Sequence, residues 1–399
     1  MKKVLSLSWL LWAVGAYGAS TVSDVTVNFD DNARMMTIGY TLAGDPAVVT
    51  VDILKDGASI GAAKFADVAG DVNGVVKPGA RTISWRPERL WPEQKFDTAC
   101  FTAKVSAWAT NTPPPYLVVW ITEEKGKVRY YASEDALPGG ITNSLYRTKR
   151  LVMARIPAAG VTWRMGSGES EPGYNSVSEK QHYVTFTNDY YVGVFPMTQG
   201  QAKLAWGANL SLDTQGTAYP TVTLSYNSIR GVKGGSPNID WPNTGSAVAT
   251  NSLLGKLRAM TGLAFDIPTE AQWEYAARAG SAAAYPNNLD CLVHDGTDTN
   301  LSLIGWYAAN SGSQMRPVGQ KLPNAWGLYD VCGTIWEWCR DWVDTSLQMS
   351  SADVTDPPGL ASATNRSRRG GCYNNQPYAA RCAFRTSNTP DTANGNISF

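Results

Sequence analysis

The sequence has few histidines and no excess charge of either sign. Two histidines occur in 399 residues, and 34 lysines and arginines balance 34 acidic residues. Because no basic excess is present to attract phosphates, we expect no nucleic-acid partner. Beyond the first residues the chain also lacks an apolar run long enough to cross a bilayer, so we expect no membrane span in the mature protein.

The first 18 residues have the pattern of a secretory signal peptide. Lys2 and Lys3 precede an apolar stretch from Val4 to Val14, and small residues follow at Ala16 and Gly18. The stretch is short for a membrane anchor, although an uncleaved anchor is the alternative. The pattern predicts that residues 1–18 are removed and that the protein is secreted, periplasmic or held at the cell surface.

Six cysteines in an exported chain are expected to form disulfides, because nothing keeps thiols reduced outside the cytosol. Four of them, Cys332, Cys339, Cys372 and Cys382, lie in the C-terminal part of the chain. Their spacing does not determine which cysteines pair.

Residues 19–112 are predicted to form an all-β domain. Apolar side chains alternate with period two along Val25–Phe29, Met36–Leu42 and Val49–Ile53, with turn residues between these stretches. This spacing favours an immunoglobulin-like or fibronectin-like sandwich. The region has no cluster of acids, histidines or cysteines, so we expect a spacer or adhesion role. The prolines 113–115 begin a predicted linker over residues 113–150.

Residues 151–399 contain an ordered series of motifs. They are Met165-Gly166, Glu179 before His182-Tyr183-Val184, Met197-Thr198, the string IPTEAQWEYAARAG from Ile267, PNAWGLYD from Pro323, Trp336-Glu337-Trp338 and Arg369-Gly370-Gly371. The series resembles the formylglycine-generating enzyme (sulfatase-modifying factor) family. This resemblance implies an α+β domain related to C-type lectins, with little regular secondary structure.

One of these motifs predicts a helix independently of the resemblance. Thr269 can cap the helix, and Glu270 and Glu274 lie in its first turns, where carboxylates interact favourably with the helix dipole. Trp273 would lie on the packed side. We therefore interpret this segment as a buried structural helix.

Enzymes of the family oxidise a sulfatase cysteine to formylglycine with copper and oxygen, using two cysteines that follow Gly-Gly-Ser. The corresponding segment here reads GGCYNNQPYAARCAFR. Cys372 stands where the family has serine, Asn375 stands near the first copper cysteine, and residues 377–380 contain no sulfur. Copper(I) requires soft thiolate ligands, so we expect neither bound copper nor the oxidase activity.

Cys382 matches a family cysteine that normally forms a structural disulfide. If the chain were nevertheless active, Cys372 and Cys382 would be the candidate catalytic residues, as a displaced reactive pair. We favour the alternative, in which each forms a disulfide with the other or with Cys332 or Cys339.

Two other chemistries are not supported by the sequence. A related branch of the fold contains iron enzymes whose metal is held by three histidines, whereas this chain has only His182 and His294. A serine hydrolase is not expected either, because no Gly-x-Ser-x-Gly elbow with a matched histidine is present.

The resemblance also implies a structural calcium site at Asp330, Gly333, Ile335 and Glu337. Two side-chain carboxylates and two main-chain carbonyls would supply the hard oxygen ligands that calcium prefers. The alternative is that Glu337 forms an ion pair with Arg340 or Arg369.

The segment from Tyr373 to Asn396 is rich in uncharged residues that form hydrogen bonds, a composition that suits a recognition surface. It resembles the C-terminal region of diversified bacterial variable proteins with this fold, although loop-stabilising residues would have the same composition. The candidate ligand-binding residues are Tyr373, Asn374, Asn375, Tyr378, Arg381, Ser387 and Asn388.

These observations favour a secreted member of the family that lacks copper oxidase activity. It would act as a binding or structural module, with an unknown protein or small ligand in the C-terminal groove. The alternatives are a sulfatase-modifying oxidase and a diversified ligand-binding variable protein.

Overall fold

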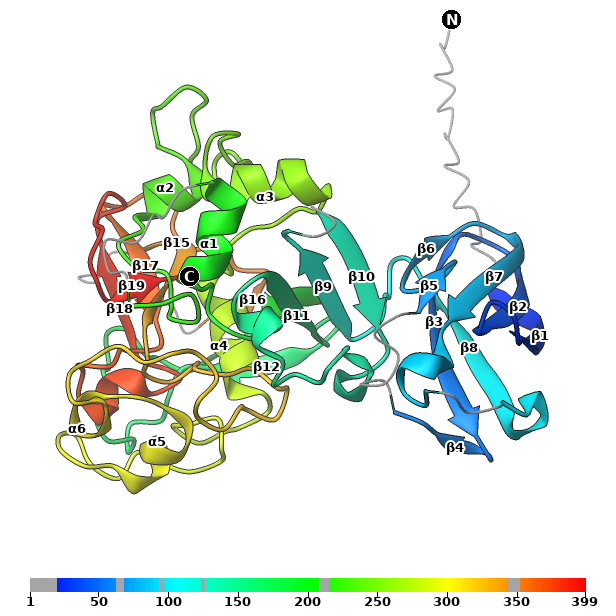
Figure 1. Ribbon diagram of the computed structural model, residues 1–399. Helices are drawn as coiled ribbons and strands as arrows, with labels where there is room; N and C mark the ends of the chain where they lie inside the picture. The colour runs from blue at the N-terminus through cyan, green and yellow to red at the C-terminus, as the bar shows by residue number, and fades with distance from the viewer. Residues whose placement is uncertain (1–19, 62–67, 93–95, 123–125, 208–214, 344–351) are drawn as a thin grey trace, which may run out of the picture. The chain divides into compact units, whose positions relative to one another are not determined.

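The computed structural model describes residues 20–61, 68–92, 96–122, 126–207, 215–343 and 352–399. The predicted signal peptide at residues 1–18 lies outside these ranges. The chain divides into two compact units, residues 1–113 and 114–399 (Figure 1). Among the described segments, no helix has both the length and the apolar character needed to cross a membrane.

The N-terminal unit consists of short antiparallel strands. They are β1 (Thr21–Asp30), β2 (Met35–Ala43), β3 (Ala47–Lys55), β4 (Ala58–Ser59), β5 (Ala69–Gly70), β6 (Gly74–Val76), β7 (Gly79–Trp85) and β8 (Phe101–Ala109). One sheet has the order β1-β2-β7-β5, and in the other β3 pairs with β4, β6 and β8. Side chains from both sheets share one apolar core.

Strand β2 shows how the alternating pattern produces this core. Met36, Ile38, Tyr40 and Leu42 are buried, whereas the residues between them are partly exposed. Successive side chains of a strand point to opposite faces, so alternating apolar residues place one face of the strand in the core. The predicted alternating stretches therefore do form strands.

The C-terminal unit is mixed α and β, mostly β. Its strands are β9 (Tyr116–Trp120), β10 (Lys127–Tyr131), β11 (Arg150–Ile156), β12 (Thr162–Met165), β13 (His182–Thr185), β14 (Tyr190–Gly193), β15 (Trp336–Val343), β16 (Val354–Thr355), β17 (Asn365–Arg369), β18 (Arg385–Asn388) and β19 (Ile397–Ser398). Its helices are α1 (Gln199–Trp206), α2 (Tyr226–Arg230), α3 (Leu253–Thr261), α4 (Glu270–Arg278), α5 (Thr299–Ile304) and α6 (Ala308–Ser311).

The described strands of this unit form three sheets, with the orders β10-β9-β11-β14, β12-β13-β16 and β18-β17-β15-β19. Strands β9 and β10 come from the segment predicted to be a linker, and β9 pairs with β11 along its length. In the C-terminal sheet, β19 runs parallel to β15, with Ile397 beside Trp336. The last residues of the chain are therefore held beside the Trp-Glu-Trp motif.

Helix α4 forms where its capping residues predict it. The Thr269 side chain accepts a hydrogen bond from the backbone N–H of Gln272, and the Gln272 side chain bonds back to Thr269. Glu270, Trp273 and Glu274 are all buried. The helix is therefore an internal element, with its two carboxylates enclosed by the surrounding structure.

Candidate functional site

A polar pocket of about 360 Å³ is formed at the C-terminal sheet. Its lining residues are Trp336, Arg368, Asn375, Tyr378, Ala379, Phe384, Thr386, Asn388, Asn394 and Asn396. Four side-chain amides, a hydroxyl and a guanidinium therefore face one cavity together with three aromatic rings.

The pairing of β15, β17 and β18 positions this lining (Figure 1). Arg368 on β17 lies directly across from Thr386 on β18, and Asn388 follows two residues later on the same face of that strand. A short 3-10 helix, Pro377–Ala380, contributes Tyr378. Regular strands thus supply part of the pocket, and the loops after Cys372 and before β19 supply the remaining amides.

Cys372 lies behind the pocket and is fully buried. Its thiol donates to Oδ1 of Asn374 at 2.9 Å and to Oδ1 of Asn375 at 2.8 Å. Nδ2 of Asn396 donates to the sulfur at 3.5 Å. Burial raises the pKa of the Cys372 thiol to about 11, so the thiol is neutral at physiological pH.

The structure brings together three of the seven predicted ligand-binding residues: Asn375, Tyr378 and Asn388 line the pocket. Asn374 lies beside the Cys372 thiol instead, and the Ser387 hydroxyl accepts a hydrogen bond from Asn365 at 3.4 Å. The Tyr373 ring packs against the apolar core, and its carbonyl accepts a hydrogen bond from Ser311.

Arg381, the seventh, has a structural environment. It is fully buried and forms two hydrogen bonds of 2.8 Å with the carboxylate of Glu179. It also donates to Glu171 at 2.6 Å and to the carbonyl of Gly173 at 2.6 Å. These contacts occupy its guanidinium, so Arg381 joins the acidic loop after β12 to the C-terminal segment and does not line the pocket.

Several lining residues are not among those predicted from the sequence. Asn394 and Asn396 fall within the polar segment from Tyr373 to Asn396. The composition of that segment was therefore a signal that could have identified them. Trp336 and Arg368 come from earlier strands, and only the pairing of those strands brings them to the pocket. No local pattern marks them as pocket residues.

The six cysteines are all free thiols in the structure, in contrast to the expected disulfides. Cys332, Cys339 and Cys382 share one buried apolar cluster, in which burial and the neighbouring Cys382 raise the pKa of the Cys332 thiol. Cys372 belongs to a different cluster. Cys372 and Cys382 therefore do not form the reactive pair considered above, because their thiols have separate surroundings.

The residues at the pocket do not fit a copper site of the family's kind. Two thiolates would be required, but no cysteine lines the pocket, and an asparagine faces the Cys372 thiol behind it. The adjacent thiols of Cys332 and Cys382 are both fully buried elsewhere. Among the described residues, no group of three or more histidine, cysteine or acidic side chains could hold a metal ion.

The two histidines lie in unrelated places. His182 is buried on β13, and its Nδ1 lies 3.0 Å from the Lys180 carbonyl. His294 is exposed, contacts Asp295 at 2.7 Å and stacks on the Tyr378 ring, with 4.1 Å between ring centroids. His294 therefore supports one wall residue of the pocket.

The predicted calcium ligands lie on one tight loop, Asp330 to Ile335, and at the start of β15, which contains Glu337. Asp330, Gly333 and Thr334 have left-handed backbone angles, with φ of 61°, 77° and 64°, which curl the chain before β15. Asp330 accepts hydrogen bonds from Gly319 N–H at 2.6 Å and from the Thr334 hydroxyl at 3.2 Å. Glu337 accepts a hydrogen bond of 2.6 Å from Trp273 Nε1.

Both carboxyls are held in an environment that disfavours their charge. Burial raises the pKa of Asp330 to about 6, and burial together with the charge of Asp330 raises the pKa of Glu337 to about 7. Among the described residues, no lysine or arginine forms a salt bridge with either. Arg340 pairs with Asp266, and Arg369 pairs with Glu274, so the alternative pairing of Glu337 does not form.

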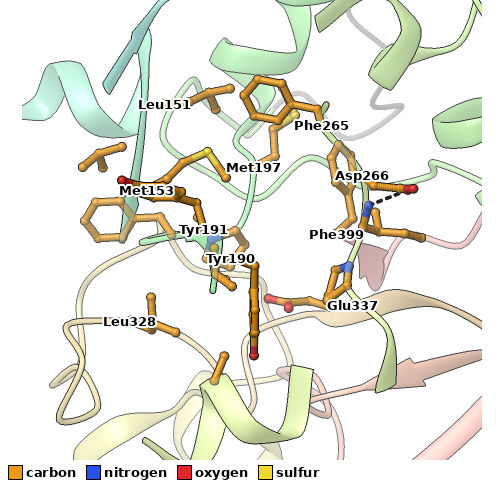
Figure 2. A pocket seen from close by; sticks show the side chains of 18 of the residues that line it. Leu151, Met153, Tyr190, Tyr191, Met197, Phe265, Asp266, Leu328, Glu337 and Phe399 are labelled. Carbon is orange, nitrogen blue, oxygen red and sulfur yellow. Dashed lines mark hydrogen bonds between the residues drawn. The ribbon is translucent and has the colours of Figure 1, made fainter. Parts of the chain in front are cut away.

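A second cavity, of about 460 Å³, lies inside the C-terminal unit. Figure 2 shows Leu151, Met153, Met197 and Leu328 around it, with the Glu337 carboxylate directed inward. Apart from Glu337, none of the predicted site residues lines this cavity. Its wall is mainly apolar, which distinguishes it from the amide-rich pocket.

Comparison with known proteins connects this unit to one family. The model of the sulfatase-modifying factor enzyme 1-like domain matches residues 163–399, more than half of the chain. The formylglycine-generating enzyme of Streptomyces coelicolor is 35% identical over 145 residues, which cover 33% of this chain and 45% of that protein. The enzyme of Thermomonospora curvata is 36% identical over 143 residues, covering 33% and 47%.

The chain thus spans less than half the length of these curated relatives. Among solved structures, Treponema denticola variable protein 1 is similar, with a TM-score of 0.49 and 23% identity, over 63% of this chain and 94% of that one. The family match covers the motifs from residue 163 onward, and it confirms the resemblance that those motifs indicated. The chain belongs to the sulfatase-modifying factor family, whose domain occupies its residues 163–399.

Proposed function

We propose that this protein is an exported member of the family that binds a ligand in its C-terminal pocket and does not oxidise cysteine. The observation that carries this proposal is the pairing of the Cys372 thiol with Oδ1 of Asn375 at 2.8 Å. An amide oxygen cannot replace a copper thiolate, whereas side-chain amides suit the recognition of polar ligands.

The shape of the pocket supports a binding role. Its volume of about 360 Å³ falls within the usual range for small-molecule sites, roughly 300 to 1,000 Å³. In the described part of the chain, Nδ2 of Asn375 and the side-chain amide of Asn394 have no hydrogen-bond partner. These groups are free to contact a ligand.

For the N-terminal unit we propose a spacer or adhesion role on an immunoglobulin-like sandwich. Two antiparallel sheets around one core support this assignment. Its role would be to hold the C-terminal domain away from the export machinery or the cell surface, consistent with cleavage after residue 18. N-terminal sequencing of protein recovered outside the cytoplasm tests the cleavage.

We also propose a structural calcium ion at the loop before β15. The side chains of Asp330 and Glu337 and the carbonyls of Gly333 and Ile335 would hold it. In the described part of the chain, the buried Asp330 and the partly buried Glu337 have no basic partner, and such a pair of carboxylates suits a divalent cation bound through oxygen. The ion would neutralise both carboxylates and fix the loop.

A diversified variable protein is a more specific form of the binding proposal. The amides around the pocket sit on the C-terminal segment, where such proteins would vary. A reverse transcriptase gene and a near-copy of the 3′ coding segment beside this gene would support it. The absence of both would contradict it without affecting the general binding role.

The oxidase alternative is tested with the full chain, copper(I) and a Cys-x-Pro-x-Arg peptide under oxygen. The proposal predicts no formylglycine by mass spectrometry, while the Streptomyces coelicolor enzyme converts the same peptide as a positive control. Copper-dependent conversion would overturn the proposal.

A further inference from the structure

The pocket contains one arginine without a carboxylate partner. Arg368 lies on β17 between Arg366, which pairs with Asp240 at 3.1 Å, and Arg369, which pairs with Glu274. No acidic residue lines the pocket, and in the described ranges no carboxylate lies within salt-bridge distance of Arg368. Its Nε is buried and makes no hydrogen bond.

The groups around Arg368 contact its guanidinium but do not neutralise its positive charge. The guanidinium carbon lies 5.1 Å from the centre of the Trp336 ring. Burial lowers the pKa of Arg368 to about 10, which still leaves it charged at neutral pH. The nearby Cys372 thiol does not compensate this charge, because its own pKa is raised and it stays protonated.

The rest of the lining matches a hydroxylated molecule. Side-chain amides both donate and accept hydrogen bonds, as sugar hydroxyls require, and four of them surround the cavity. The Tyr378 ring is fixed between His294, stacked at 4.1 Å, and Phe384, edge-on at 5.3 Å. A rigid aromatic wall offers apolar contact area to the C–H face of a ring.

We infer that the pocket binds a carboxylate-bearing sugar, with the carboxylate on Arg368 and the hydroxyls on the amides of Asn375, Asn388 and Asn394. Guanidinium and carboxylate groups form a planar pair of hydrogen bonds, and a partly buried cation such as Arg368 gains more from such a pair than a fully exposed one does. This inference rests on the proposed binding function and specifies its ligand class.

The test uses calorimetric titration of the full chain with glucuronate, N-acetylneuraminate and uncharged glucose. We expect the acidic sugars to bind and glucose to bind at least about 10-fold more weakly, because it lacks the charge-assisted pair. Methyl glucuronide and a glycan that ends in the same acidic sugar distinguish a free sugar from a glycan terminus as the source.

Substitutions then assign the contact to Arg368. R368Q should lose at least about 10-fold in affinity for the acidic sugars, and R368K should lose less because it keeps the charge. R164Q, at an exposed arginine on β12, is the matched control and should bind normally. Thermal melting checks that each variant folds.

Equal binding of acidic and neutral sugars, or unchanged binding by folded R368Q, would overturn the acidic-ligand inference while leaving a binding pocket. Absence of binding by every sugar would also overturn it. Neither result bears on the oxidase assay, which tests the proposed function separately.

Discussion

The thiol of Cys372 donates a hydrogen bond to Oδ1 of Asn375, 2.8 Å away. In an oxidase of this family, a second thiolate would be needed near this position to hold copper(I). Here the asparagine amide occupies that place and also accepts a hydrogen bond from the Cys372 backbone at 3.1 Å. The arrangement stabilises a protonated cysteine in a polar loop, and it is the basis of the binding proposal.

Replacing Arg381 should destabilise the fold and not merely weaken ligand binding. In R381M, the buried carboxylate of Glu179 loses both of its 2.8 Å partners, which should lower the free energy of unfolding by about 3 to 5 kcal/mol. Urea denaturation measures the loss. The double variant E179M/R381M should recover part of it, since the fully buried Glu179 charge is removed and only Glu171 is left without its arginine partner; a fully stable R381M would contradict the structural role.

Calcium should stabilise the protein through the loop before β15. At a calcium concentration about 100-fold above the dissociation constant, binding to the folded state should add roughly 2.7 kcal/mol to the free energy of unfolding. Thermal melting with calcium and with EDTA measures the difference. D330N and E337Q should abolish the response, whereas D295N, at an exposed carboxylate, should keep it. A response that survives in both loop variants would place the ion elsewhere.

Asp341 should make stability fall as the pH rises. Burial and the charge of Glu270 raise the pKa of Asp341 to about 7, above its value in the unfolded chain. Between the two pKa values the folded state holds a proton that the unfolded state lacks, so the contribution of Asp341 to stability is greatest below about pH 4 and decreases up to about pH 7.

The variant D341N isolates this effect, because its amide cannot ionise but can still accept the 2.8 Å hydrogen bond from the Glu270 N–H. From pH 5 to pH 8 the wild type should lose about 3 kcal/mol relative to D341N, measured by urea denaturation at each pH. Parallel pH profiles for the two proteins would show that Asp341 is not the responsible group.

Export should oxidise Cys332 and Cys382 to a disulfide. Both thiols lie in one buried cluster, close enough that Cys382 raises the pKa of the Cys332 thiol. Exchange with an oxidised disulfide oxidoreductase would form the S–S bond, transferring two electrons and two protons to the oxidoreductase. Peptide mapping of exported protein without reductant should yield a linked Cys332–Cys382 fragment. Linkage of Cys372 to either residue would contradict the separate surroundings of these thiols.

The sequence predicted the elements whose determinants are local. The alternation from Met36 to Leu42 produced a strand with one buried face, and Thr269 with Gln272 capped a helix. In the linker region, the strand β9 pairs with β11, and that partner is specified only by the fold.

The candidate site was predictable in part for the same reason. Asn375, Tyr378 and Asn388 stood in a segment whose composition indicated recognition, and they line the pocket. Arg381 shares that segment, but its partner Glu179 is 202 residues away in the sequence. Arg368 is likewise set apart from its neighbours only by the carboxylates that Arg366 and Arg369 meet in three dimensions. Among the described residues, ion pairs with distant carboxylates therefore occupy Arg366 and Arg369 and leave Arg368 available to a ligand.

The most direct measurement is copper(I) binding combined with peptide conversion by the wild-type chain. We expect no copper bound at the pocket and no formylglycine formed, because no cysteine lines the pocket and the Cys372 thiol behind it faces Asn374 and Asn375 and is kept protonated by burial. Copper binding that disappears in C372S, together with conversion of the Cys-x-Pro-x-Arg peptide, would contradict the account.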